Sequence, residues 1–232
     1  MRMQTPFPIA EFADQINGLA NELLVANLHF QIGTGLRKAW RSYFDEIKEA
    51  PVFWQYTIHS HDTMAVLGLC RVYDNTRFGD KSCLTLQRFL ATVENNPGVF
   101  GEAEFRKRLE QRKNPYVGSL VQQLPKLDPK QVAEDMSFCE HDSAVKHLQN
   151  LRNKVIAHLD YEYIIGAQKN FAKSNPLPYD DIQRLIDEGF RIVNRYSGLF
   201  SAMTHSERVA SRQDQDFLNV LNALKRLREM NL

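Results

Sequence analysis

The segment from Asp142 to Tyr163 reads DSAVKHLQNLRNKVIAHLDYEY, and its apolar residues recur with the period of a helix. They are spaced three or four residues apart, which places them along one stripe of an α-helix. The stripe consists of Leu148, Leu151, Val155 and Leu159. Because burying one apolar face removes it from water, the stripe predicts a helix packed against the core of the protein.

Two polar residues of this segment suggest chemistry as well as structure. Arg152 carries a permanent planar cation whose donors match a phosphate, and His158 titrates near neutral pH. RNA already contains its own nucleophile, the 2′-hydroxyl, so a base and a cation over the phosphate are enough for cleavage without a metal. The pair therefore indicates cleavage of an RNA phosphodiester.

The residues alone leave a structural role open. A helix that carries polar groups on a solvated face and a cation near its C-terminus is common, and Asp160 could simply hold His158. Six residue steps place Arg152 and His158 roughly 120° apart on an ideal helix. For both groups to reach one phosphate, either the helix distorts here or a second chain completes the site.

The string LRNKVIAHLD, residues 151–160, resembles the signature of the HEPN superfamily, and within it the AbiU-like abortive-infection proteins. In those proteins a helix upstream opens with Phe-Trp and closes near Arg-x-Tyr-Asp. The corresponding residues here are Phe53-Trp54 and the run from Arg71 to Asp74, followed by the segment from Ser82 to Phe89. The resemblance covers the middle of the chain.

The resemblance implies a helical bundle that forms a homodimer, with motif residues of two chains lining one cleft. Many HEPN proteins are metal-independent endoribonucleases that act as toxins or in phage defence, whereas others keep the fold without activity. By position, Arg152 and His158 match the catalytic pair and Asn153 matches the polar residue beside the arginine. Five residues separate the pair here, whereas many members have four.

The same resemblance implies RNA as substrate, and an antitoxin or a nucleotidyltransferase as partner. We expect Lys154, between the two catalytic residues, and Tyr161, three residues after His158, to contact the RNA. The alternative function is a catalytically inactive helical module that binds a partner protein, a nucleotide or RNA. No cofactor is expected.

The composition of the chain indicates the number of domains, the kind of RNA binding and the cellular compartment to expect. The chain has 232 residues, which favours one domain, and 29 Lys and Arg balance 28 Asp and Glu. RNA binding would therefore rest on local groups and not on a global positive field. The three cysteines lack metal-type spacing, and no apolar run approaches the length of a membrane span or a signal peptide. We expect a cytoplasmic protein without a membrane association.

A metal site is not expected at His59, His61 and Asp62. The two histidines are two residues apart and point to different sides of a helix, whereas zinc requires converging ligands. His61 lies on an apolar stripe, so we expect it in the core or at an interface.

The predicted fold class is all-α, a HEPN-type helical bundle with additional N- and C-terminal helices and without strands. Apolar spacing predicts the helices 9–30, 36–47, 51–74, 86–93, 102–113, 129–141, 182–203 and 217–228. Gly33 and Gly35 predict a hinge, which would make residues 8–50 a helical hairpin packed on the bundle. Residues 114–128 are expected as a loop, and Arg71 is expected to pair with Asp74.

Overall fold

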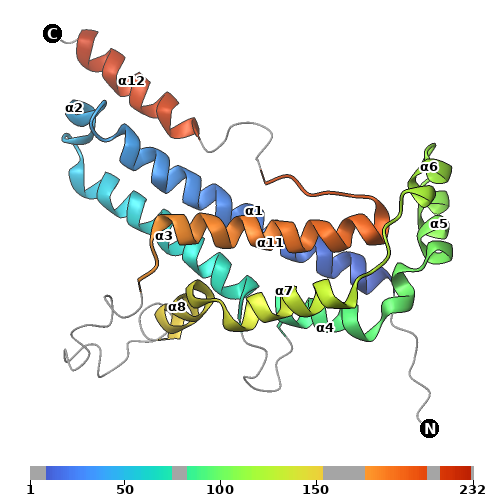
Figure 1. Cartoon of the computed structure of the whole chain (residues 1–232). Coiled ribbons are helices and arrows are strands. Elements are labelled where there is room, and N and C mark those ends of the chain that lie inside the picture. The colour runs from blue at the N-terminus through green and yellow to red at the C-terminus, as the bar shows by residue number, and fades with distance from the viewer. Residues whose placement is uncertain (1–8, 75–82, 154–175, 208–214, 231–232) are drawn as a thin grey trace.

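The computed structural model describes residues 9–74, 83–153, 176–207 and 215–230, and every regular element in these ranges is helical (Figure 1). This confirms the all-α class. The elements are α1 (Ile9–Ala39), α2 (Phe44–Ile47), α3 (Pro51–Val72), α4 (Leu86–Asn95), the 3₁₀ helix η1 (Pro97–Phe100), α5 (Glu102–Gln111), α6 (Val117–Gln122), α7 (Pro129–His141), α8 (Ser143–Leu151), α11 (Tyr179–Ser201) and α12 (Asp216–Met230). In these ranges no helix is both long and apolar enough to cross a membrane.

The main core lies between α1, α3, α4, α7, α8 and α11. The long helix α1 packs along α3 and also along α11, and α4 packs against α7 (Figure 1). Phe12 of α1 is fully buried and contacts the rings of Phe89, Phe100 and Phe200 from three other elements. Large apolar side chains from distant parts of the sequence thus meet at one point and stabilise the bundle.

A second, smaller core joins α12 to the C-terminal part of α1, to α2 and to the start of α3. Leu221 of α12 is fully buried and packs with Leu36, Ile47 and Trp54. At the surface, Arg228 of α12 forms an ion pair with Asp45 at 2.7 Å. The C-terminal helix is therefore attached by apolar contact as well as by charge.

The predicted hinge at Gly33 and Gly35 is wrong, because α1 continues through both glycines to Ala39. Their role is close packing: a Cβ at Gly33 would lie 3.0 Å from Asp62 Oδ1, and a Cβ at Gly35 would lie 2.7 Å from the ring of Phe217. The expected hairpin within residues 8–50 does not form either. The helix that pairs with α1 is α3, and α2 is only four residues long.

The predicted starts of the helices at residues 51 and 129 are confirmed. Asp128 caps α7 by accepting a hydrogen bond from the backbone N–H of Lys130 at 2.9 Å, and Pro51 occupies the first turn of α3. The expected loop 114–128, however, contains α6 (Val117–Gln122). This short helix is held by tertiary contact, since Val121 packs with Phe105 and Leu109 of α5.

Candidate functional site

Arg152 lies directly after the last residue of α8, where the helix changes shape. Arg152 and Asn153 form a π-helical turn, which is wider than an α-helical turn. The backbone N–H of Arg152 still bonds to the carbonyls of Leu148 and Gln149. This is the kind of distortion that the sequence required if one helix were to carry both groups of the motif.

The Arg152 side chain is held between two acceptors. Its Nη2 donates to Asp74 Oδ2 at 2.8 Å, and its Nη1 donates to Asn153 Oδ1 at 2.9 Å. The Arg152 side chain is 33% exposed and that of Asp74 is 21% exposed, so the pair lies at the surface without being fully solvated. A charge-assisted bond of this kind fixes the plane of the guanidinium.

The predicted pairing of Arg71 with Asp74 is wrong. Arg71 donates to Glu22 Oε1 of α1 at 2.7 Å instead. The reason is that α3 ends at Val72, so Asp74 has left the helix and no longer lies one turn away from Arg71. Asp74 can therefore accept a hydrogen bond from Arg152, which follows α8 directly.

Three further contacts bind the end of α3 to α8 and α11. Gln149 donates to the carbonyl of Tyr73 at 2.8 Å, and the Cys70 thiol lies 3.8 Å from the carbonyl of Leu148. Tyr73 is fully buried and donates to the carbonyl of Leu185 at 2.6 Å. Burial raises the pKa of the Cys70 thiol to about 12, so this thiol is protonated at neutral pH and serves packing.

The start of α8 is held by Asp142. Its Oδ1 accepts from the backbone N–H of Ala144 at 2.9 Å, and both carboxylate oxygens accept from Arg184 of α11 at 3.0 Å. Burial alone would raise the pKa of Asp142, but the hydrogen bonds from Arg184 and the backbone outweigh it and lower that pKa. Both ends of α8 are therefore anchored to neighbouring helices.

Replacing Asp142 with asparagine is expected to lower the free energy of unfolding by about 1 kcal/mol at pH 7, because the cap is retained and the exposed ion pair is lost. A carboxylate whose pKa is lowered by folding stabilises the protein above its unfolded-state pKa, and this stabilisation is lost as the pH falls through the folded-state pKa. Urea denaturation at pH 7 and at about pH 2 measures the difference between the two proteins. A gap of equal size at both pH values would contradict this account.

The structure places two of the predicted site residues, Arg152 and Asn153, side by side. His158, Lys154 and Tyr161 lie outside the described residues. Asp74 was not predicted as part of the site, although it belongs to the run from Arg71 to Asp74, which is part of the resemblance together with residues 151–160. That both runs belong to one signature was the available signal that they meet in space.

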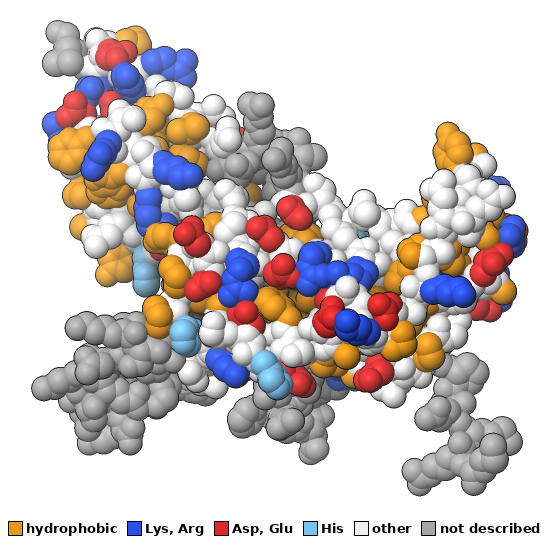
Figure 2. All heavy atoms as spheres, viewed as in Figure 1, with side chains coloured by type: hydrophobic (Ala, Val, Ile, Leu, Met, Phe, Trp, Pro, Cys, Tyr) orange, Lys and Arg blue, Asp and Glu red, His pale blue; other side chains and the backbone are white. Residues whose placement is uncertain are grey.

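His147 is a further polar residue of α8 near the site. Its Nδ1 lies 2.8 Å from the carbonyl of Pro176, so residue 176 lies against α8. The face drawn in Figure 2 mixes acidic and basic side chains along α11. No large basic surface appears on this face, as the near-neutral composition suggested.

His61 and Asp62 of α3 pair with side chains of α1. His61 Nδ1 lies 2.8 Å from Nδ1 of His29 in α1, and Asp62 forms an ion pair with Arg37. Burial lowers the pKa of both histidines, which favours one neutral ring donating to the other. His61 thus lies at a contact between two helices. In the part of the chain that the structure describes, no three His, Cys, Asp or Glu side chains are grouped to hold a metal ion.

Arg152 and Asn153, directly after α8, lie against Tyr73 and Asp74 at the end of α3, and the resemblance to HEPN proteins contains both of these runs. The HEPN_AbiU2 family model, described as AbiU2, matches residues 9–221, and the chain belongs to this family. No curated protein matches the chain, and no solved structure does.

Proposed function

We propose that this protein is a metal-independent endoribonuclease that acts in abortive infection or as the toxin of a toxin–antitoxin pair. The observation that carries the proposal is the Arg152 guanidinium directly after α8, oriented by Asp74 and Asn153 and still one-third exposed. Membership in the AbiU2 family supports the role in defence.

Each motif residue has a defined part in the proposed reaction. His158 removes the proton of the 2′-hydroxyl or protonates the leaving 5′-oxygen, and Arg152 stabilises the negative charge on the phosphorane. The bond from the 2′-oxygen to phosphorus forms while the bond from phosphorus to the 5′-oxygen breaks. The products are a 2′,3′-cyclic phosphate and a free 5′-hydroxyl.

Asn153 and Asp74 position the catalytic arginine. A guanidinium has five N–H donors, and the bonds to these two residues use two of them. An arginine held in this way loses less side-chain entropy when it binds a phosphate than a freely rotating one. Lys154 and Tyr161 would contact the backbone and a base of the RNA.

The proposed assembly is a homodimer in the cytoplasm. The resemblance to HEPN proteins implies that motif residues of two chains line one cleft, so the histidine of one copy would serve the arginine of the other. An antitoxin or a nucleotidyltransferase would restrain the enzyme in healthy cells.

The test is to incubate the purified protein with RNAs of varied sequence in EDTA. We expect cleavage that persists in EDTA and leaves 2′,3′-cyclic phosphate ends, which mass spectrometry of the fragments detects. The variant His158→Ala should lose this cleavage by at least about 100-fold, the scale of general acid–base catalysis. Loss of activity on chelation would refute the metal-independent mechanism.

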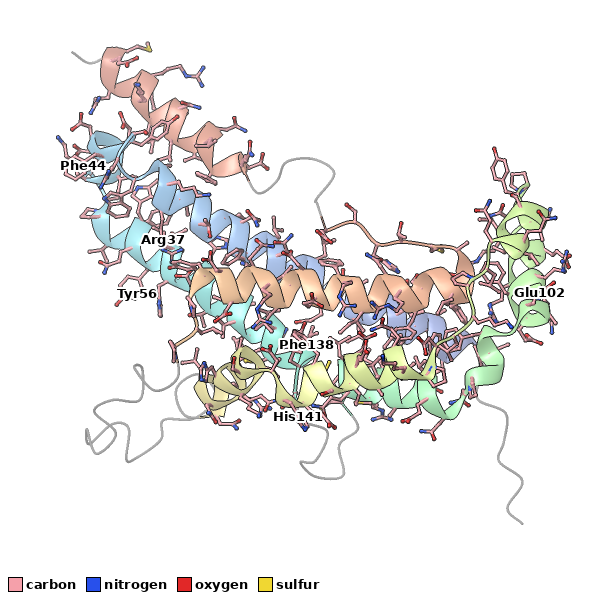
Figure 3. All side chains as sticks on the ribbon, in the orientation of Figure 1. Arg37, Phe44, Tyr56, Glu102, Phe138 and His141 are labelled. Atoms are coloured by element: carbon pink, nitrogen blue, oxygen red, sulfur yellow. The ribbon has the colours of Figure 1, made fainter. Side chains whose placement is uncertain are left out.

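Exposed apolar side chains favour a second candidate, a catalytically inactive module that binds a partner protein. Phe53 and Tyr56 are 61% and 66% exposed, and Phe44 and Leu227 are exposed by more than half. Figure 3 shows Phe44 and Tyr56 at the end of the molecule formed by α2 and the start of α3, close to α12. Large apolar side chains in one region commonly mark protein interfaces. This function predicts that RNA remains intact and that Tyr56→Ala, in this exposed apolar region, weakens assembly with the partner.

A further inference from the structure

A cavity of about 520 Å³ lies between the α5–α6 pair and the C-terminal part of α11, far along α11 from the Arg152 site (Figure 1). This volume is in the usual range for small-molecule sites. Most of its lining is apolar, with Phe105, Leu120, Leu124 and Leu199 among the contributing residues. Such a lining would bury the hydrocarbon part of a ligand.

Charge in this cavity comes mainly from Arg195. Its side chain is 26% exposed and lines the cavity, and it forms an ion pair with Asp135, which is 1% exposed. The same carboxylate accepts from Arg191 at 3.3 Å and from the Tyr196 hydroxyl at 2.8 Å. Arg191 also forms an ion pair with Glu188, so the charges of this cluster balance, and Arg195 is its only charged member that lines the cavity.

Two other charged residues line the cavity. Lys126 adds a positive charge and Asp128 adds a negative charge, with the Asp128 carboxylate engaged in capping α7. The charged side chains that line the cavity are thus two cations and one carboxylate, which suits a ligand with a single negative charge. A nucleoside triphosphate would require several more cations.

Gly198 of α11 provides an independent observation. It lines the cavity, and a Cβ built at this position would meet nothing within 4 Å. A glycine inside a helix costs roughly 0.5–1 kcal/mol relative to alanine. Since no neighbouring atom requires the missing side chain, the glycine keeps the wall of the cavity open at a cost to helix stability.

We propose that this cavity binds a small amphiphilic monoanion, an alkyl or aryl carboxylate, whose carboxylate pairs with Arg195. The hydrocarbon part lies among Phe105, Leu124 and Leu199, against the open wall at Gly198. Binding requires neither His158 nor Arg152, so it is independent of RNA cleavage.

Calorimetric titration with decanoate, and with decanol as the uncharged probe, tests the proposal on the full chain. We expect one decanoate per chain. Gly198→Leu, which fills the cavity, should weaken the binding of both probes by about tenfold or more while the melting temperature does not fall. Arg195→Gln should weaken decanoate by about tenfold and change decanol by less than about twofold, the effect of losing one charged hydrogen bond.

Two controls keep this test decisive. Arg195→Lys preserves the charge beside Asp135, so it should bind decanoate within about threefold of the original protein even if Arg195→Gln does not fold. Leu224 lines another large apolar pocket, between α12 and the start of α3, so Leu224→Gln should leave decanoate binding unchanged. The proposal is overturned if decanoate does not bind, if Gly198→Leu binds it normally, or if Leu224→Gln abolishes the binding.

Discussion

Replacing Arg152 with alanine is expected to slow RNA cleavage by about two to three orders of magnitude, the usual effect of removing one preorganised donor from a charged transition state. The guanidinium is oriented before RNA arrives, because Asp74 and Asn153 already hold it. The loss should therefore appear in kcat, where stabilisation of the phosphorane acts, and less in KM. Steady-state cleavage of a fluorescent RNA in EDTA measures both quantities.

Arg71→Ala is the matched control for this experiment. Arg71 lies near the same end of α3 but pairs with Glu22, and its side chain is 61% exposed. We expect its cleavage rate to stay within about twofold of the original, since exposed ion pairs contribute little. Asp74→Asn retains an acceptor without the charge, so an intermediate loss of about tenfold is expected. An Arg152→Ala protein of normal activity would remove the basis of the proposed mechanism.

Replacing Asp135 with alanine is expected to lower the free energy of unfolding by about 3–5 kcal/mol, because breaking a buried charged pair leaves its partners uncompensated. The carboxylate is 1% exposed and accepts from Arg191, Arg195 and Tyr196. Its removal leaves Arg195 without its carboxylate and the buried Tyr196 hydroxyl without its acceptor, whereas Arg191 keeps its ion pair with Glu188. Because α7 and α11 meet at this carboxylate, the loss affects the core of the bundle.

Urea denaturation followed by circular dichroism gives the required free energies. Glu134→Ala is the control in the adjacent position, where the carboxylate is 56% exposed and lies 3.8 Å from Lys130. It should cost less than about 0.5 kcal/mol. A loss below about 1 kcal/mol for Asp135→Ala would show that the neighbouring helices adapt to the missing charge.

Local signals in the sequence predicted much of the fold. The helix starts predicted at residues 51 and 129 are those of α3 and α7, and Asp128 caps α7. These signals are readable because a cap satisfies backbone groups within two or three residues of itself. The apolar periods likewise predicted α3, α4, α11 and α12 to within a few residues.

The errors all involve contacts between distant residues. Gly33 and Gly35 look like a hinge in the sequence, yet they permit close approach of Asp62 and Phe217. The short helix α6 was missed because its stability comes from packing on α5. Asp74 was paired with its near neighbour Arg71, whereas its partner is 78 residues away.

The amino-acid sequence by itself determined the helical class, most helix boundaries and the residue types of the HEPN motif, since helix period and capping are properties of short segments. Only the tertiary structure decided that Asp74 holds Arg152, that Asp135 joins α7 to α11, and that a cavity opens beside Gly198. These features depend on which helices pack together, and the free energy of such packing comes from residues far apart in the chain.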